Sequence, residues 1–359
     1  MGEGLLDERL VERLAVKVPL SRGEGARREL LSRGLLDRGV HVERDGGYLL
    51  LPLAPGLEPE EAAKLAEAEV VRWRFRERPS RPKDLVEALQ GRLPPFKLAF
   101  LPSSYDLIGD VAIVELPPEL EEDGEAVAQG IMLIHPRVRT VYAKAGFVEG
   151  EFRVRPLKLL KGVDNPVTLH RENGCLFKVD VSSVYFSPRL STERLRVVRQ
   201  VNSWEVVADL FAGVGPYAIQ VAKHRGAFVY AVDLNPRAVE LLKENVKLNR
   251  VEDRVAVIQG DARKVVEEKL KGRADRVILH HPSQALNFLD VGSAALKKEG
   301  GVLHVYSFAR QASEVEERAV EGLSKLWGRV EVAHRGLIKQ VSPRRWEVVV
   351  DVKVAELLT

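Results

Sequence analysis

The sequence predicts an α/β protein in which a doubly wound, mainly parallel sheet follows two small α+β domains. From about residue 204, strands alternate with helices of about a dozen residues, which is typical of a parallel sheet with helices on both faces. The length of 359 residues is too great for one ordinary domain. Prolines at positions 79, 82, 94 and 95 also separate two N-terminal segments of mixed strand and helix pattern.

The first domain is predicted over residues 1–78. "LAVKVPL" indicates a strand, and "RGVHVERDGGYLLLPLA" indicates a hairpin that turns at Asp45-Gly46-Gly47. "EPEEAAKLAEAEVVRW" predicts a helix with acids in its first turn, where the helix dipole favours them. "RWRFRERPSRPK" then places Trp73 and Phe75 among basic residues. That pattern can follow phosphates and stack on bases, or it can belong to a solvated helix end.

Three further segments complete the predicted organisation. The Pro- and Arg-rich residues 79–96 are expected to form a linker. Residues 97–165 are expected to form a middle α+β domain, with a strand in "SYDLIGDVAIVELP" and a helix in "GEAVAQGIMLIHP". Residues 166–359 carry the doubly wound sheet, in which "EVVVDVKVAEL" is predicted to be an edge strand.

The composition restricts the compartment and the type of site. Hydrophobic residues make up 45% and charged residues 30%, as in globular proteins. Cys175 is the single cysteine, which excludes an internal disulfide and a cysteine-rich zinc site and fits a reducing cytosol. No apolar run reaches about 18 residues, and the N-terminus lacks the pattern of a secretory signal. We therefore expect a cytoplasmic protein with no membrane partner.

The stretch "DLFAGVGPYAI" predicts a ligand site at the carboxyl ends of the strands. Asp209 ends the first strand of the sheet, and Gly213 and Gly215 allow a sharp turn that approaches a ligand closely. Asp233 ends the next strand, where a carboxylate can accept both ribose hydroxyls. Asp261 ends the third strand and could reach an adenine amino group. The alternative is that these acids only cap strand ends.

The spacing within this turn argues against a dinucleotide. Ala218 stands where the third glycine of GxGxxG would be, and the turn carries Pro216. A GxxxxGK[ST] phosphate loop is also absent from the sequence. These observations favour a ligand with a ribose and an adenine but no pyrophosphate, and S-adenosylmethionine fits that description.

The motifs taken together resemble one family. "VYFSPRLSTERLRV", "VVADLFAGVGPYAI", "VYAVDLNPRAVELLKENVKLN" and "GDAR" are similar to the Trm5 family of archaeal and eukaryotic tRNA (guanine-37-N1)-methyltransferases. The resemblance implies a Rossmann-like class I methyltransferase domain and an N-terminal module that binds the tRNA elbow. It also implies methyl transfer from S-adenosylmethionine to N1 of guanosine 37. A methyl group on sulfonium is already activated, so no metal is required.

The resemblance assigns roles to individual positions. Arg153 matches an arginine that contacts O6 of the target guanine, Glu193 a carboxylate proposed as the general base at N1, and Arg189 an arginine that orders the region. Such a pair is chemically reasonable, because removal of the N1 proton shifts charge to O6. The strand-end pattern and the resemblance together predict these cofactor-contacting positions: Tyr185, Asp209, Phe211, Gly213, Gly215, Asp233, Leu234, Asp261, Ala262, His280 and Pro282.

The motif "HHP" departs from the family pattern, which has Asn-Leu-Pro there. Neutral histidine offers one donor and one acceptor, so His280 could replace the hydrogen bonding of the asparagine at the transfer site. Its protonated form would repel the sulfonium, and we therefore expect activity to fall below about pH 6.5. His281 is expected to face the other side of the sheet, because strand residues alternate.

Several alternatives remain at this stage. An aminocarboxypropyl transferase of the wyosine pathway, or a methyltransferase for a modified guanosine, would also act at position 37. A catalytically weak tRNA-binding paralogue would be expected to lack Glu193 or Arg153. Metal-dependent hydrolysis would need a third ligand beside the two histidines, for which His170 and His304 qualify by residue type alone. The expected partner is tRNA, bound by a monomer at the anticodon stem-loop and elbow, and not DNA.

Overall fold

The computed structural model describes residues 10–57, 68–78, 82–146 and 155–358. The chain divides into two compact units, Met1–Pro82 and Lys83–Thr359. Within the described residues, no helix is both long enough and apolar enough to cross a membrane.

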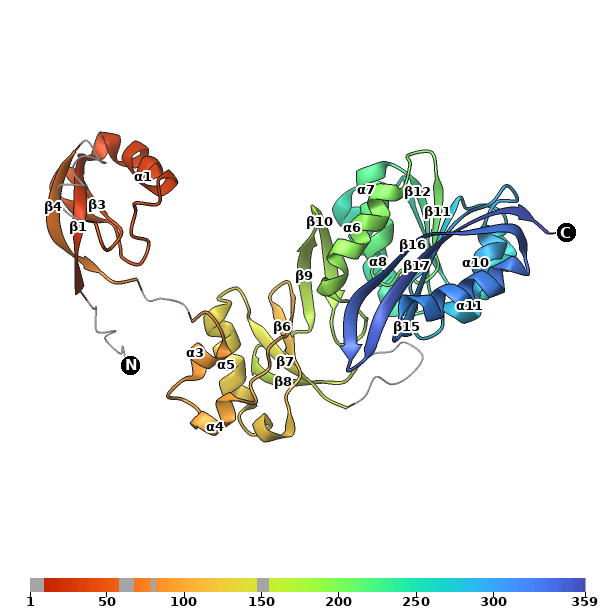
Figure 1. Ribbon diagram of the computed structural model, residues 1–359, viewed down its shortest axis with the longest axis horizontal. Helices are drawn as coiled ribbons and strands as arrows, with labels where there is room; N and C mark the ends of the chain where they lie inside the picture. Colours follow the sequence, from red (N-terminus) through yellow and green to blue (C-terminus); the bar gives the residue numbers. More distant parts are fainter. Residues whose placement is uncertain (1–9, 58–67, 79–81, 147–154, 359) are drawn as a thin grey trace. The chain divides into compact units, whose positions relative to one another are not determined.

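The first unit is built on an antiparallel sheet with the strand order β2-β3-β1-β4 (Figure 1). Its elements are β1 (Leu10–Pro19), α1 (Gly23–Ser32), β2 (Glu43–Asp45), β3 (Tyr48–Pro52) and β4 (Glu69–Arg76). The predicted hairpin is confirmed: β2 and β3 are adjacent, and Gly46 adopts a φ of 58° in the turn between them. Leu50 and Leu51 of β3 are fully buried.

The prediction of a helix over residues 58–73 is wrong in its last part. Residues 58–67 lie outside the described residues, but Glu69–Arg76 is a strand that pairs with β1. The alternation of Val71, Trp73 and Phe75 on one face explains this, because β-branched and aromatic residues favour strands. Phe75 is fully buried and therefore cannot stack on a base, whereas Trp73 is 37% exposed.

The second unit begins with a smaller sheet in the order β5-β6-β7-β8. The elements of this part are α3 (Leu85–Leu89), α4 (Pro95–Leu98), β5 (Asp106–Ile108), β6 (Val111–Val114), η2 (Pro118–Leu120), α5 (Gly124–Ile134), β7 (Thr140–Lys144) and β8 (Leu157–Gly162). Leu85 and Leu89 of α3 pack with Val127 and Ile131 of α5 in one core. Much of the stretch predicted to be a linker is therefore part of this folded core.

A hairpin and two helical segments lead from the smaller sheet to the large one. The hairpin consists of β9 (Val167–Glu172) and β10 (Cys175–Asp180), and the segments are η3 (Pro188–Leu190) and α6 (Ser191–Gln200).

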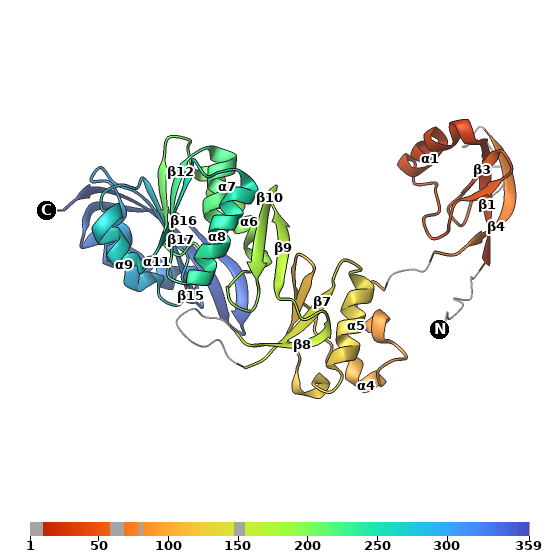
Figure 2. The ribbon, with the colours of Figure 1, turned by 180° about the vertical axis from the view of Figure 1, so that it is seen from behind.

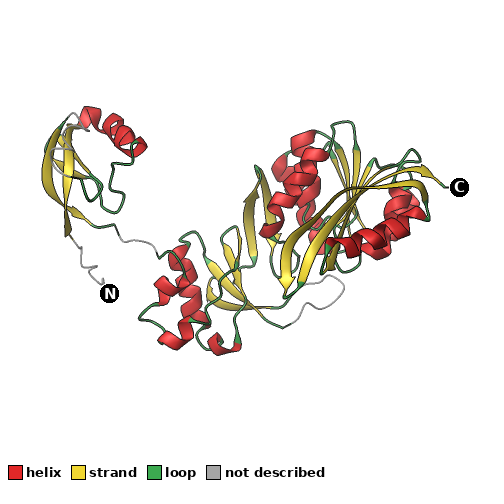
Figure 3. Ribbon diagram, viewed as in Figure 1, coloured by secondary structure: helices red, strands yellow, loops and turns green. Residues whose placement is uncertain are grey.

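The large sheet has the strand order β13-β12-β11-β14-β15-β17-β16. Its strands are drawn in yellow and the helices around it in red in Figure 3. The strands are β11 (Val206–Asp209), β12 (Phe228–Asp233), β13 (Val255–Gln259), β14 (Arg276–Leu279), β15 (Gly301–Ala309), β16 (Trp327–Ser342) and β17 (Arg345–Leu357). The first five are parallel, and β17 runs antiparallel to both of its neighbours. The last strand is therefore interior and not at the edge as predicted. The edge is β16, whose many exposed polar residues concealed it in the sequence.

Helices cover both faces of this sheet, as predicted for a doubly wound fold. They are α7 (Pro216–Arg225), α8 (Pro236–Asn249), α9 (Ala262–Val265), η4 (Val266–Leu270), η5 (Ala285–Phe288), α10 (Leu289–Ala295) and α11 (Ala312–Ser324). Val207 of β11 packs in a core with α6, α7 and α8, whereas the adjacent Ala208 packs with α9, α10 and α11. Figure 2 shows α7 and α8 on one side of the sheet and α9 and α11 on the other. Alternate residues of the buried strands thus face opposite helical layers.

Candidate cofactor and transfer site

A cavity of about 590 Å³ lies at the carboxyl ends of β11, β12, β13 and β14. The loops that follow these four strands line it at residues 210–213, 233–235, 260–263 and 280–284. Open α/β sheets bind ligands at this edge, where the ends of parallel strands meet. Tyr185 and Phe186 from the segment before α6 also line it, as do Tyr217 from α7 and Phe308 from β15.

Asp233 and Asp261 both line this cavity, as the strand-end pattern predicted. The carboxylate of Asp233 accepts the N–H of Gly213 at 2.7 Å and the N–H of Asn235 at 2.8 Å. Asp261 caps α9 by accepting the N–H of Arg263 at 2.8 Å through Oδ1. Each carboxylate retains further lone pairs for a ligand, because an ionised carboxylate has about four acceptor positions.

Asp209 lies behind the glycine turn and does not line the cavity. It is fully buried, and burial raises its pKa to about 7, although the N–H groups of Phe211 and Ala218 act in the opposite direction. Gly215 also lies off the cavity: it has a φ of 89°, and a Cβ there would meet Leu242 at 2.2 Å. Asp209 and Gly215 therefore shape the turn. The other predicted cofactor positions line the cavity and can contact a ligand.

We expect Asp209→Asn to stabilise the protein more at pH 8 than at pH 5. The pKa of Asp209 is about 7 in the folded protein against an ordinary 3.8. As the pH rises, the carboxyl group of Asp209 therefore loses its proton in the unfolded chain at a lower pH than in the folded protein. Wild-type stability therefore declines between these two pKa values, while asparagine does not titrate. The gain should grow by roughly 2–3 kcal/mol between pH 5 and pH 8. Urea denaturation at both values measures it, and an equal gain at both would contradict the assignment.

The two histidines of "HHP" both line the cavity, which corrects the expectation that His281 faces the other side of the sheet. The reason is that β14 ends at Leu279, so strand alternation does not extend to them. The ring of His281 meets Phe211 edge-on with 5.1 Å between centroids, and its Nδ1 lies 3.3 Å from Oγ of Ser283.

His280 is joined to a buried carboxylate of another strand. Its Nε2 lies 2.9 Å from Oε1 of Glu347 on β17, and Oε2 of Glu347 lies 3.2 Å from Nζ of Lys339 on β16. Burial disfavours ionisation of Glu347, but His280 and Lys339 outweigh it and lower its pKa to about 2. Lys339 also donates to the hydroxyl of Tyr185 at 2.9 Å, which connects this group to a second residue that lines the cavity.

Glu193 lies on α6, is 8% exposed and does not line the cavity. Its Oε1 accepts the hydroxyl of Tyr306 at 2.7 Å, and Arg196 donates to both of its oxygens at 2.7 Å. Asp351 binds the same guanidinium at 2.6 Å. The carboxylate predicted to be the general base is therefore held in a buried ion-pair network.

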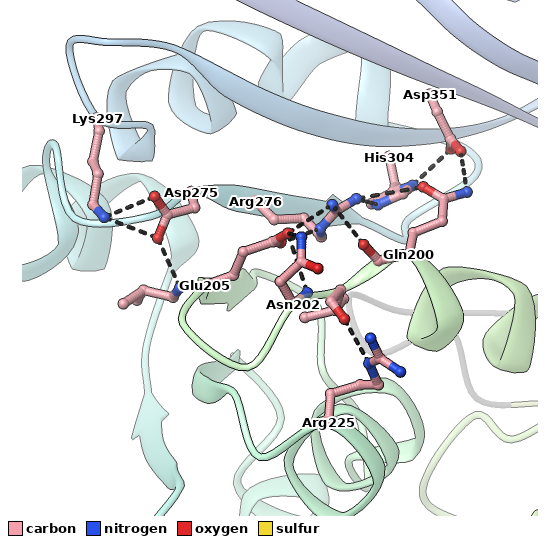
Figure 4. A network of polar contacts seen from close by, with 11 residues as sticks. Gln200, Asn202, Glu205, Arg225, Asp275, Arg276, Lys297, His304 and Asp351 are labelled. Carbon is pink, nitrogen blue, oxygen red and sulfur yellow. Dashed lines mark hydrogen bonds and ion pairs between the residues drawn. The ribbon is translucent and has the colours of Figure 1, made fainter.

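This network continues along the sheet through a buried histidine (Figure 4). Nδ1 of His304 lies 2.6 Å from Oδ1 of Asp351, and its Nε2 lies 2.9 Å from Nη1 of Arg276. Arg276 in turn donates to Glu205 at 2.6 Å. Both ring nitrogens of His304 are thus engaged by protein groups. In the described part of the chain, no three His, Cys, Asp or Glu side chains are grouped as metal ligands would be.

Comparison with known proteins identifies the family. The TRM5/TYW2 methyltransferase domain matches residues 168–333, the TYW2 N-terminal domain matches residues 85–165, and the tRNA methyltransferase 5 N-terminal domain matches residues 15–61. The tRNA (guanine(37)-N(1))-methyltransferase Trm5b of Pyrococcus abyssi is 38% identical over 345 residues, which are 95% of this chain and 99% of that protein. The chain belongs to the Trm5 family.

Solved structures of the Trm5 family share this fold. The crystal structure of wild-type Trm5b from Pyrococcus abyssi matches with a TM-score of 0.71 and covers 96% of this chain and 99% of that one. The complex of aTrm5 with tRNALeu matches with a TM-score of 0.70 at 30% identity, covering 95% and 99%. Rossmann-like methyltransferase architecture is therefore confirmed for this Trm5-family chain.

A second set of relatives consists of aminocarboxypropyltransferases. The tRNA(Phe) (4-demethylwyosine(37)-C(7)) aminocarboxypropyltransferase of Pyrococcus horikoshii is 32% identical over 271 residues, which are 75% of this chain and 95% of that protein. The structure of TYW2 from the same organism in complex with MeSAdo matches with a TM-score of 0.63 at 30% identity, covering 76% and 98%.

The remaining predicted catalytic arginines differ in their placement. Nε of Arg189, on η3, lies 2.7 Å from Oδ1 of Asp106 on β5, so Arg189 joins the smaller sheet to the segment before α6. It does not line the cavity. Arg153 lies outside the described residues.

The structure also places Arg194 in the site of this Trm5-family chain, a residue that sequence analysis did not single out. Arg194 lines the cavity, is 2% exposed and donates to Glu172 at 2.6 Å and to the carbonyl of Ser187 at 2.9 Å. Glu347 and Lys339 were also missed. Glu347 could have been suspected, because the run "WEVVVDV" places two acids, Glu347 and Asp351, among apolar residues, and each requires a partner if the strand is buried.

Proposed function

We propose that this chain transfers a methyl group from S-adenosylmethionine to N1 of guanosine 37 in tRNA. The strongest support is the extent of the likeness to Trm5b, which spans 95% of the chain and includes the N-terminal domain match. The likeness to the aminocarboxypropyltransferase covers 75% of the chain.

The cavity suits an adenosine ligand without pyrophosphate. Its volume of about 590 Å³ lies within the roughly 300–1,000 Å³ of small-molecule sites. Asp233 would accept the ribose hydroxyls and Asp261 the adenine amino group, while Phe211 and Phe288 supply apolar surface. When bound, S-adenosylmethionine supplies a methyl group already activated by its sulfonium, so positioning supplies much of the rate. Tyr185, Gly213, Leu234, Ala262 and Pro282 also line this space.

The acceptor must lose a proton before or during transfer. Guanine N1 carries hydrogen, and its removal shifts negative charge to O6, so the site needs a base and a donor. The roles of Glu193, Arg153 and Arg189 at the guanine remain predictions. For Glu193 to reach the guanine, it would first have to leave the guanidinium of Arg196 that now binds both of its oxygens.

Transfer RNA is the proposed partner. The aTrm5 protein that matches this chain was solved with tRNALeu, and residues 15–61 match the tRNA methyltransferase 5 N-terminal domain. Binding of the tRNA elbow by residues 1–78 and of the anticodon stem-loop by the rest remains a prediction. The target base would have to leave its stack to reach the cavity.

Aminocarboxypropyl transfer is the second candidate. It is favoured by the match of residues 85–165 to the TYW2 N-terminal domain and by the departure at His280 from the asparagine of the methyltransferases. It would take a different carbon from the same sulfonium, so the two reactions leave different groups on the base.

Nucleoside analysis distinguishes the two candidates. The full chain is incubated with methyl-labelled S-adenosylmethionine and tRNA transcripts that carry G37 or A37, and the digested nucleosides are identified by mass. We expect labelled N1-methylguanosine from the G37 transcript and no product from the A37 transcript. An unlabelled aminocarboxypropyl adduct on the G37 transcript, or on a transcript whose base 37 is already demethylwyosine, would establish the second candidate instead.

A further inference from the structure

Lys339 on β16 occupies a position that a β-bulge directs towards the interior. Before this position, exposed and partly buried residues alternate along the strand: Leu337 is 50% exposed, and Ile338 packs against the core. The register between β16 and β17 shifts between Leu337 and Lys339, so that the residue after Ile338 points inward as well. The side chain of Lys339 is only 16% exposed as a result. Bulges re-aim side chains in this way, often next to functional sites.

Three oxygen atoms hold the ammonium group of Lys339. It donates to the hydroxyl of Tyr185 at 2.9 Å and to Oγ of Ser187 at 3.2 Å, and it lies 3.2 Å from Oε2 of Glu347. Burial acts to lower the pKa of Lys339, but Tyr185 and Glu347 outweigh it and raise that pKa above its ordinary 10.5. The group therefore stays charged, and each of its three N–H groups has an acceptor. Lys339 is thus engaged inside the protein and would have to give up one of these contacts to bind a phosphate.

These contacts fix residues 185–187, which lead along the wall of the cavity into η3. Tyr185 lines the cavity but is 53% exposed, so packing alone does not hold its ring. Within the described residues, Lys339 is the hydrogen-bond partner of the Tyr185 hydroxyl. Lys339 is itself anchored by Glu347 and Ser187, which are 1% and 6% exposed. A nearly buried cation on β16 therefore determines where an exposed aromatic ring lies at the cavity.

We infer that Lys339 is a positioning residue for cofactor binding, which acts by holding Tyr185 at the wall of the cavity; this rests on the proposed function, in which S-adenosylmethionine occupies that cavity. Lys339 does not line the cavity, so its effect passes through the tyrosine. Because the ring is already in place, the ligand does not have to order it on binding. Ordering side chains during binding lowers affinity, and a preorganised site avoids that loss.

Titration of the full chain with S-adenosylmethionine tests the role of Lys339. Lys339→Met should weaken binding by about tenfold, which corresponds to about 1.4 kcal/mol, because Tyr185 must then be ordered as the ligand binds. In methylation assays with a G37 transcript, the loss should appear in KM for S-adenosylmethionine more than in kcat.

Lys297→Met is the matched control. Nζ of Lys297 also lies beside a carboxylate, that of Asp275 at 2.7 Å, but Asp275 precedes β14 and so lies at the opposite ends of the strands from the cavity. The Lys297→Met variant should bind S-adenosylmethionine as tightly as wild type.

Tyr185→Phe separates positioning from a general effect on stability. It removes only the hydroxyl that Lys339 holds, so the variant should fold normally and should also bind S-adenosylmethionine more weakly than wild type. In a Lys339→Met background, the same substitution should change the affinity by less than about twofold, because the contact is already absent and the two effects are not additive. A purely structural role of Lys339 would lower the urea midpoint without this coupling in affinity.

Three results would overturn the inference. One is a folded Lys339→Met variant whose affinity for S-adenosylmethionine matches that of Lys297→Met. Another is an effect of Tyr185→Phe that is equally large in the wild-type and Lys339→Met backgrounds, since Tyr185 would then act without Lys339. The third applies even if Lys339→Met does not fold: a Tyr185→Phe variant that binds as tightly as wild type. Failure of wild type to bind S-adenosylmethionine or to produce N1-methylguanosine is a separate outcome, because it would refute the proposed function itself.

Discussion

Asp233→Ala is expected to weaken binding of S-adenosylmethionine by at least about 100-fold. Hydrogen bonds to charged groups contribute about 1.5–3 kcal/mol each, so losing two ribose contacts costs about 3 kcal/mol or more, which corresponds to this factor. The substitution also removes the acceptor of the Gly213 and Asn235 N–H groups, which fix the loop that lines the cavity. Isothermal titration of the full chain with S-adenosylmethionine measures the effect.

Asp253→Ala is a suitable control for that measurement. Asp253 is an exposed aspartate whose nearest cation, Arg254, lies 3.6 Å away, and it is not among the residues that line the cavity. The Asp253→Ala variant should bind S-adenosylmethionine with the same affinity as wild type. If Asp233→Ala folds normally and binds within threefold of the control, Asp233 does not hold the ribose.

The position of Asp233 illustrates what the sequence could predict. A carboxylate at the end of a strand, one βα unit after a glycine turn, has its place determined by local structure and by the parallel order of neighbouring strands. The same reasoning located Asp261 and Gly213. The positions of these residues are determined by short segments with strong sequence patterns. The same patterns also predicted the doubly wound fold.

The partners of His280 and Glu193 could not be predicted in this way. Glu347 reaches His280 from a strand 67 residues later in the chain, and Asp351 reaches Arg196 across 155 residues. Both contacts depend on the insertion of β17 between β15 and β16. Nothing local to "SPRLSTER" indicates that Arg196, one turn after Glu193, binds both of its oxygens.

The strand β4 shows a different limit. Its sequence "EVVRWRFR" continues directly from an Ala- and Glu-rich stretch with acids in its first turn, and the helix predicted for that stretch was extended into it. Tertiary pairing with β1 decided the outcome, because Phe75 is buried only in the strand conformation that pairs it with Val11. Propensity is a weak prior where a neighbouring strand offers such pairing.

Asp351→Ala is expected to destabilise the unit Lys83–Thr359 by about 3–5 kcal/mol, the typical result of removing one partner from a buried ion pair. Asp351 is 1% exposed and accepts from Arg196 at 2.6 Å, from His304 at 2.6 Å and from Gln200 at 3.2 Å. Its removal leaves Nη1 of Arg196 and Nδ1 of the buried His304 without this acceptor, although Arg196 keeps its bonds to Glu193. Urea denaturation followed by tryptophan fluorescence reports this unit, because Trp204, Trp327 and Trp346 lie in it.

The dependence of this effect on pH is a stricter test than its size. Burial raises the pKa of Asp351, but His304 and Arg196 outweigh it and hold that pKa well below its ordinary 3.8. The stabilisation is therefore complete above about pH 4–5 and is lost as the pH falls towards the folded pKa. Glu321→Ala, which removes an exposed pair with Lys325, should change stability by at most about 0.5 kcal/mol at every pH. If the two variants behave alike at pH 7, the buried network around Asp351 does not stabilise the sheet.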